Sequence, residues 1–140
     1  MSQFKVPKIE HILFSTAMDI KISDINYGNH LGHDALISLI HEARVRFLKH
    51  HGFTELNING VGILITTLLV NYIGEAFYAD ELIINIGIGE TTRISTELLY
   101  EIYRKNTSEQ IARALTTLTF FDYSKRKVAK IPQEFLSSIK

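Results

Sequence analysis

SDINYGNHLGHDALISLIHEARVRFLKHHG, the stretch from Ser23 to Gly52, is the part of the chain around which the rest is organised. Residues 23–33 are polar and rich in glycine, asparagine and histidine, which is typical of a turn. From Asp34 to His51, apolar residues recur at spacings of three and four, which predicts an amphipathic helix that stops at Gly52. Because the first N–H groups of a helix lack partners within it, we expect the functional site where the turn meets the helix.

The predicted helix has two candidate N-caps and one apolar stripe. Asn29 and Asp34 both have side chains that suit an N-cap. The stripe that should face the core comprises Leu36, Leu39, Ile40, Ala43 and Phe47. Ala43 is the small residue within this stripe, so we expect it to help line a pocket for an apolar substrate group.

The composition is that of an ordinary one-domain protein and excludes several functions. The chain has 140 residues, 46% of them apolar and 21% charged, so we expect one domain over residues 1–140. Its formal net charge of zero gives no reason to expect nucleic acid as a partner. The absence of cysteine excludes disulfides and a thiol nucleophile. We see neither a secretory signal nor an apolar run of membrane length, so we expect a soluble cytoplasmic protein with no membrane partner.

The rest of the chain is rich in strand patterns. One strand is expected before the turn, within residues 10–22, and the later ones at 61–73, 81–88, 92–104 and 111–123, with a short helix after Pro132. This order predicts an α+β fold in which the four later strands form an antiparallel meander and the long helix packs on the sheet.

The predicted sheet has more apolar surface than one helix covers. Its second face and its edges would remain open, although the strands are too apolar to face water on both sides. We therefore expect a homodimer, or a dimer of dimers, with a continuous sheet and sites shared between subunits.

These blocks of sequence resemble the hotdog-fold thioesterases, and among them they look most like the 4-hydroxybenzoyl-CoA thioesterase family of acyl-CoA thioesterases. The family pattern is a strand, a turn of the form D-x-D-x-x-G-H-V-N-N, a helix with E-x-A-R, and four strands. The matching residues are Asp24, His30, Leu31, the block His41-Glu42-Ala43-Arg44, and Ala79-Asp80-Glu81-Leu82.

The resemblance implies a hotdog fold, an antiparallel sheet wrapped around one long central helix. It also implies hydrolysis of an acyl thioester, carried by coenzyme A or by an acyl carrier, with no cofactor besides the coenzyme A of the substrate. The chain departs from the family where the second aspartate, assigned as nucleophile or general base, becomes Asn26. An amide cannot take up a proton as a carboxylate does. Gly32 and His33 replace the two asparagines.

Two carboxylates could replace the missing one. Glu42 lies on the helix, and we expect it to matter more than Asp24. If the first strand continued to Asn26, Asp24 and Asn26 would share a face. Glu42 could equally be a solvated residue paired with Arg46, four positions later.

The turn supplies the remaining candidates. Asn26 could orient a water, polarise the thioester carbonyl through its N–H, or shape the turn. His30 could transfer a proton or tie the turn to the sheet. The N–H groups of Gly32, His33 and Asp34 could bind the thioester oxygen. His30, His33 and Asp34 form too weak a pattern for a metal, so we expect none. The run 125–130 could bind phosphates of coenzyme A or be a solvated turn.

Two other functions stay open. A hotdog hydratase carries D-x-N-P-x-H, but here the proline is absent and His30 comes one position too late. A non-catalytic protein that binds acyl thioesters is the other alternative.

Overall fold

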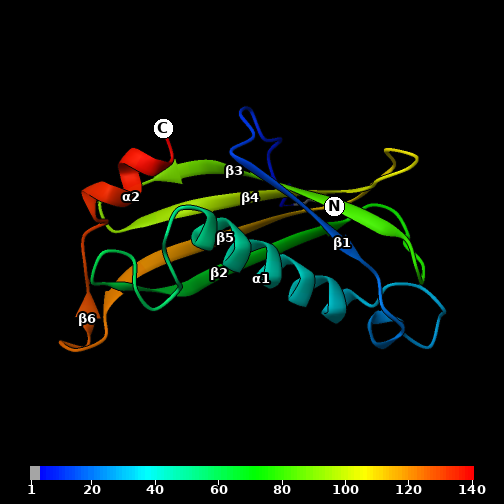
Figure 1. Ribbon diagram of the computed structural model, residues 1–140, viewed down its shortest axis with the longest axis horizontal. Coiled ribbons are helices and arrows are strands. Elements are labelled where there is room, and N and C mark those ends of the chain that lie inside the picture. Colours follow the sequence, from blue (N-terminus) through cyan, green and yellow to red (C-terminus); the bar gives the residue numbers. More distant parts are fainter. Residues whose placement is uncertain (1–3) are drawn as a thin grey trace.

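The protein is a curved antiparallel sheet with one long helix lying across it (Figure 1). The computed structural model describes residues 4–140. The strands are β1 (Phe14–Asp19), β2 (Gly62–Tyr72), β3 (Glu81–Thr91), β4 (Ser95–Arg104), β5 (Gln110–Asp122) and β6 (Lys127–Val128). The helices are the 3₁₀ turn η1 (Ile22–Asp24), the central helix α1 (His33–His50) and α2 (Gln133–Ser138). The expected hotdog architecture and the short helix after Pro132 are thus confirmed.

The order of the strands corrects the expected meander of four. The sheet runs β1-β3-β4-β5-β2, so β3, β4 and β5 form a meander while β2 lies beyond β5. The reason is the path of the link between β2 and β3. Gly74 N–H donates to Ile111 O of β5 at 3.0 Å, and Ala79 N–H donates to Ile20 O beyond β1 at 3.1 Å. The link therefore crosses the end of the sheet, and β3 pairs with β1.

Helix α1 buries the predicted stripe but begins earlier than predicted. Leu36, Ile40, Ala43 and Phe47 are at most 1% exposed. The N-cap is Gly32, whereas both predicted caps are wrong. Asn29 lies within the turn in a left-handed conformation, with φ of 66°, and Asp34 lies inside the first helical turn. At the other end Gly52 has φ of 82°, a conformation that glycine adopts readily.

The chain leaves the strand conformation before the site. β1 ends at Asp19, and Ile22–Asp24 form a 3₁₀ turn in which the Asp24 carboxylate accepts a hydrogen bond from Lys21 N–H at 2.8 Å. The strand does not continue to Asn26, so the condition under which Asp24 and Asn26 would share a face is not met. A hydrogen bond from a nearby backbone N–H to an aspartate side chain competes with the backbone hydrogen bonds of a strand, and it favours a turn.

The outer face of the sheet is partly covered, contrary to expectation. The segment Phe4–Ile9 lies across it, and its Val6 packs with Leu99 and Leu115 in a second apolar cluster. The Val6 N–H donates to Asn71 Oδ1 at 2.7 Å, and the Ile9 N–H donates to Glu101 Oε2 at 2.9 Å. Side chains of β2 and β4 thus bind the backbone of this N-terminal segment.

One edge of the sheet remains open and apolar. Strand β2 is the last in the strand order. Its neighbourhood exposes Leu64, Ile65, Leu68, Tyr72 and Ile73 by 38% to 53%. Proteins usually protect such an edge with charges, proline or another chain.

Within residues 4–140, no helix combines the length and the apolar character that crossing a membrane requires.

Candidate active site at the start of the central helix

The loop before α1 is held in a fixed shape by its own backbone. Asn26 N–H donates to His30 O at 3.0 Å, and Gly32 N–H donates to Asp24 O at 3.0 Å. Leu31 N–H donates to Ala76 O at 2.8 Å, which fastens the loop to the link between β2 and β3. The crossing path of that link therefore positions the loop.

Asn26 shapes this loop with its side chain. Its Oδ1 accepts a hydrogen bond from Gly28 N–H at 2.9 Å and faces His30 N–H at 3.5 Å. This is the geometry of an Asx turn, in which a side-chain oxygen replaces a backbone acceptor. The carbonyl end of the amide is thus engaged in the turn.

His30 connects the loop to the link between β2 and β3. Its Nδ1 lies 3.1 Å from Leu31 O, and because a carbonyl only accepts, Nδ1 carries the proton. Its Nε2 lies 3.7 Å from a carboxylate oxygen of Glu75. The side chain is 34% exposed, so the ring holds the loop while one edge reaches solvent.

The start of α1 presents N–H groups for which residues 4–140 supply no side-chain cap, although the N–H of Gly32 itself already donates to Asp24 O. Gly32 is the N-cap and makes no side-chain cap bond. A Cβ at Gly32 would lie 2.8 Å from Asp34 Oδ1 and 3.5 Å from Asn26 Cβ, so the position has room only for glycine unless Asp34 moves. The positive end of the helix dipole adds to these donors. Together they favour an oxygen that carries, or develops, negative charge.

Tyr72 joins this site to the open edge of the sheet. Its hydroxyl donates to His33 O at 3.0 Å, and its ring meets the His33 ring edge-on at 6.4 Å. Burial raises the pKa of Tyr72, and the charge of Asp34 raises it further. The sequence analysis missed Tyr72, because no local pattern indicates that the end of β2 meets the start of α1.

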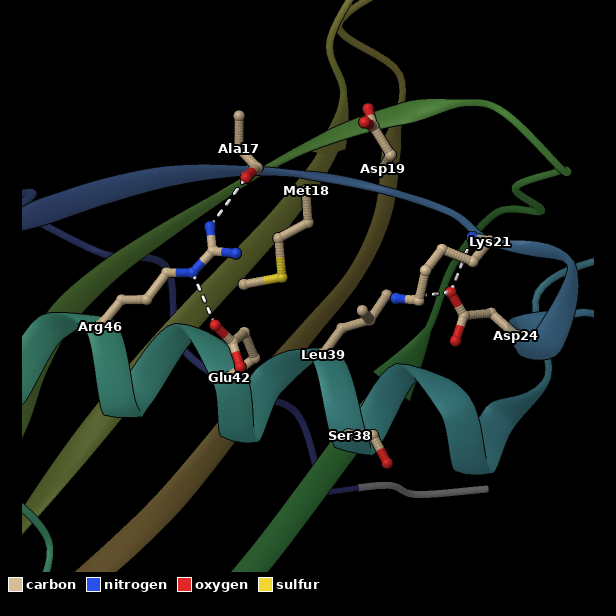
Figure 2. Close-up of a pocket in the computed structure, with 9 residues that line it drawn as sticks. All are labelled: Ala17, Met18, Asp19, Lys21, Asp24, Ser38, Leu39, Glu42 and Arg46. Atoms are coloured by element: carbon tan, nitrogen blue, oxygen red, sulfur yellow. Dashed lines mark hydrogen bonds and ion pairs between the residues drawn. The ribbon is translucent and has the colours of Figure 1, made fainter.

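A cleft of about 470 Å³ lies between β1 and α1 (Figure 2). It brings Asp24 and Glu42 to one surface, although 18 positions separate them. Asn26, His30, His33 and Ala43 do not line it. The lining residues are Ala17, Met18, Asp19, Lys21, Asp24, Ser38, Leu39, Glu42 and Arg46.

Both carboxylates of interest in the cleft are paired. Glu42 Oε2 accepts from Arg46 Nε at 2.8 Å, and Asp24 lies 3.7 Å from the Lys21 ammonium. Arg46 also donates to Ala17 O at 2.9 Å, which ties the helix to β1. Glu42 is 52% exposed, so water reaches it. It lies on the β1 side of the helix, away from the open edge at β2.

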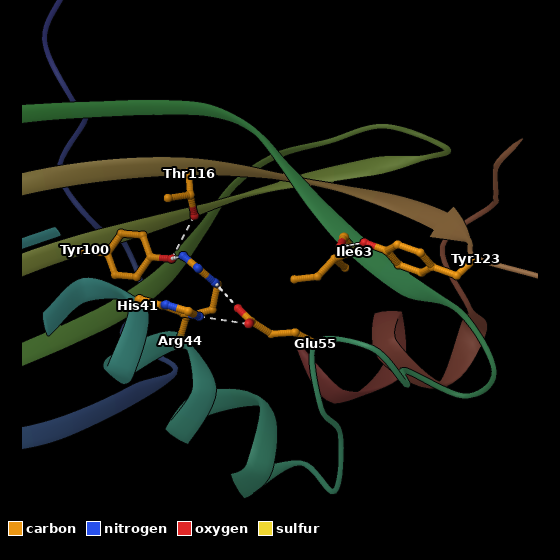
Figure 3. Close-up of polar contacts among 7 residues, drawn as sticks. All are labelled: His41, Arg44, Glu55, Ile63, Tyr100, Thr116 and Tyr123. Atoms are coloured by element: carbon orange, nitrogen blue, oxygen red, sulfur yellow. Dashed lines mark hydrogen bonds and ion pairs between the residues drawn. The ribbon is translucent and has the colours of Figure 1, made fainter. Parts of the chain in front are cut away.

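The opposite side of α1 carries a partly buried polar network (Figure 3). Arg44 is 6% exposed and donates from Nε to Glu55 Oε2 at 2.7 Å. His41 Nε2 lies 2.9 Å from the other Glu55 oxygen, and the Tyr100 hydroxyl bonds to Thr116 at 2.8 Å. Burial alone would raise the pKa of the Glu55 carboxyl, but the bonds to Arg44 and His41 outweigh it and lower that pKa. Arg44 Nη1 also donates to the Tyr100 hydroxyl at 3.4 Å, so the network joins the helix both to β4 and to the loop after α1.

The remaining predicted residues fall outside the cleft. Ala43 is fully buried in the core, between helix and sheet, so its place in a substrate pocket stays a prediction. Across residues 4–140, histidine and acidic side chains form no group of three that could hold a metal ion.

Comparison with known proteins gives a family match and a set of similar folds. The model of a family described as the thioesterase-like superfamily matches residues 20–139. Among curated proteins, no sequence matches the chain.

Three solved structures illustrate the similar folds. A 1,4-dihydroxy-2-naphthoyl-CoA thioesterase from Synechocystis is 20% identical, with 90% of this chain and 94% of that chain covered and a TM-score of 0.82. A gentisyl-coenzyme A thioesterase is 19% identical, with coverage of 91% and 100% and a TM-score of 0.80. An aspartate-to-asparagine mutant of 4-hydroxybenzoyl-CoA thioesterase, complexed with 4-hydroxybenzoyl-CoA, is 17% identical, with coverage of 91% and 98% and a TM-score of 0.81. At such low identities, the TM-scores of these three structures establish a shared fold and nothing more.

Proposed function

The chain belongs to the thioesterase-like superfamily, and from this premise we propose that it hydrolyses an acyl thioester of coenzyme A. The observation that carries the proposal is the uncapped start of α1 on a loop held by backbone bonds. The three similar structures are named for aromatic acyl-CoA substrates. Aromatic acyl groups are therefore the first substrates to test.

In the proposed reaction, the thioester carbonyl oxygen points at the N–H groups of the first turn of α1. Attack of water on the carbonyl carbon moves negative charge onto that oxygen. Fixed donors stabilise this charge more than they stabilise the neutral substrate, by about 3–4 kcal/mol for one donor in known enzymes. The His33 side chain and Tyr72 border the same position.

A carboxylate of the cleft would activate the water. Glu42 takes the proton as the water oxygen bonds to the carbonyl carbon, the C–S bond breaks, and the proton passes to the leaving thiolate. Its solvent access supports this role, and Asp24 in the same cleft supplies a second negative charge. Asn26 would keep the loop and the thioester in position.

A non-catalytic thioester-binding protein is the second candidate, favoured by the turn at Asn26. The amide that replaces the family carboxylate is engaged in loop geometry, and the asparagine mutant of 4-hydroxybenzoyl-CoA thioesterase is complexed with a thioester. In this role the chain would bind acyl-CoA and leave it intact.

Release of free thiol from a panel of aromatic and aliphatic acyl-CoA esters tests the two candidates. We expect turnover, and we expect Glu42→Gln to lower kcat at least ~100-fold, the low end for loss of a general base. Glu134→Gln, an exposed change on α2, is the control. Full activity in Glu42→Gln would exclude Glu42 as the base. Tight binding of every ester without turnover would favour the binding protein.

A further inference from the structure

The tip of the hairpin between β5 and β6 concentrates positive charge. We call residues 122–128 the basic hairpin, and its side chains Lys125, Arg126 and Lys127 are exposed. None of these three makes an ion pair with any residue in the part of the chain that the structure describes. The one acidic residue, Asp122, uses Oδ1 to accept from Ser124 N–H and Lys125 N–H, both at 3.0 Å. Its carboxylate therefore forms the turn, and the cations remain available.

This hairpin is anchored beside the first residues of β2. The Tyr123 hydroxyl donates to Ile63 O at 2.9 Å (Figure 3). A Cβ at Gly62 would lie 2.6 Å from the Tyr123 ring, so glycine makes room for this contact. The Arg126 guanidinium lies over the Phe121 ring, 5.7 Å from its centre. The cations therefore have a defined place relative to the start of β2.

Within one chain, the basic hairpin and the candidate site lie at opposite ends of the sheet (Figure 1). Strand β2 begins at Gly62, which pairs with Phe121 next to the hairpin, and ends at Tyr72, which contacts His33. A substrate at the start of α1 therefore lies far from the hairpin of its own chain.

A two-fold dimer through the open edge would bring them together. A two-fold axis pairs β2 antiparallel with the same strand of the partner, so the start of one β2 faces the end of the other. The exposed apolar residues along this edge favour such a pairing. The partner's β5 would then lie two strand spacings, about 10 Å, from Tyr72.

From this arrangement we propose that the basic hairpin of one protomer binds the phosphates of the coenzyme A ester held at the start of α1 in the other protomer. This inference rests on the proposed function for the identity of the ligand. Coenzyme A carries a diphosphate and a 3′-phosphate at the end remote from the thioester. Several cations on one short turn suit this clustered charge, since arginine and lysine both bind phosphate.

The first experiment replaces Lys125, Arg126 and Lys127 together by Gln and compares acyl-CoA with the matching acyl-pantetheine, which lacks the phosphates. We expect KM for acyl-CoA to rise at least ~10-fold with kcat unchanged, and no change for acyl-pantetheine. Replacing Lys5, Lys8 and Lys140 by Gln removes the same charge elsewhere and should change neither. An unchanged KM for acyl-CoA, or an equal loss on both esters, would overturn the proposal. The proposal would also be overturned if the triple variant lost activity only on an acyl ester of an acyl-carrier protein, tested as a third substrate.

Binding separates this proposal from the proposed hydrolysis. Wild-type protein should bind adenosine 3′,5′-bisphosphate, and the triple variant should bind it at least ~10-fold more weakly by calorimetry, whether or not any ester is turned over. Equal affinities would refute the phosphate site even in an active enzyme.

Mixed dimers test whether the hairpin acts on the neighbouring site. One subunit carries the triple change and the other Glu42→Gln, so a hairpin acting across the dimer leaves one site intact. At a low acyl-CoA concentration, at which each variant alone turns over little substrate, we expect the mixed dimers to be active. If each hairpin served its own subunit, no site would be intact and turnover would stay low.

Discussion

At the scale of single residues, Asn26 shapes the loop before α1 with its side chain. Its Oδ1 accepts from Gly28 N–H, and an aspartate has an oxygen in the same place. Bonds from backbone N–H groups favour the charged form of a carboxylate. Aspartate at this position would therefore keep the turn and add a base or nucleophile.

We predict that Asn26→Asp raises kcat on acyl-CoA by about 10-fold or more, because a placed general base contributes about 100-fold or more. Thiol release by both proteins measures the effect. The thermal midpoint should stay the same, since the loop keeps its hydrogen bonds. No gain in a folded variant would indicate that position 26 only shapes the loop.

Ala43 lies in the core between helix and sheet, where a larger side chain would have to displace its neighbours. It is fully buried, and the cleft is lined instead by Leu39, on the neighbouring helical turn. We predict that Ala43→Phe destabilises the protein by about 1–3 kcal/mol, the usual cost of overpacking a core. Urea unfolding measures this loss. A stable variant with a preference for shorter acyl chains would instead place Ala43 in the substrate pocket.

At the scale of elements, Arg44 joins α1 to Tyr100 of β4, and its counter-ion is Glu55 of the loop after α1. Removing the charge of Glu55 leaves the buried Arg44 with no other counter-ion among residues 4–140. Such a loss costs less than the roughly 3–5 kcal/mol of a fully buried pair, because Glu55 is 27% exposed. We predict that Glu55→Gln lowers the free energy of unfolding by about 2–3 kcal/mol at pH 7. Glu10→Gln, an exposed change, should have no such effect.

The same contact predicts a dependence on pH. The pKa of Glu55 is lower in the folded protein than its ordinary value of 4.5. The stability that it contributes is therefore fully present above pH 4.5 and is lost as the pH falls through the folded-state pKa. Urea unfolding at several pH values should show the gap between wild type and Glu55→Gln shrinking below that pH. A gap that is constant down to pH 3 would contradict this assignment.

At the scale of the whole molecule, the open apolar edge at β2 leads to a prediction about assembly. We predict that the wild-type protein is a homodimer and that Leu68→Lys makes it monomeric, because a charge on an apolar edge opposes pairing. Light scattering after size exclusion measures both. Leu56→Lys changes an exposed leucine in the loop after α1 and should stay dimeric. A wild-type monomer at micromolar concentration would contradict the prediction and the shared site.

The sequence by itself determined the local elements. The 3–4 spacing from Leu36 to Phe47 indicated the helix and its buried face, and the strands from β2 to β5 lie within a few residues of their predicted positions, because these patterns depend on neighbours along the chain. The turn at Asn26 and the pair Glu42–Arg46 were among the stated alternatives for the same reason.

Only the tertiary structure decided which distant residues meet. The link after Gly74 crosses the sheet instead of turning back, so β2 becomes an edge and Tyr72 reaches His33. Nothing local distinguishes a link that crosses from one that turns, because the choice depends on what else the strands can pair with. The cover that Val6 gives to Leu99 and Leu115, and the cleft shared by Asp24 and Glu42, have the same origin. All of these are contacts between segments that lie far apart in the sequence, so no local pattern indicates them.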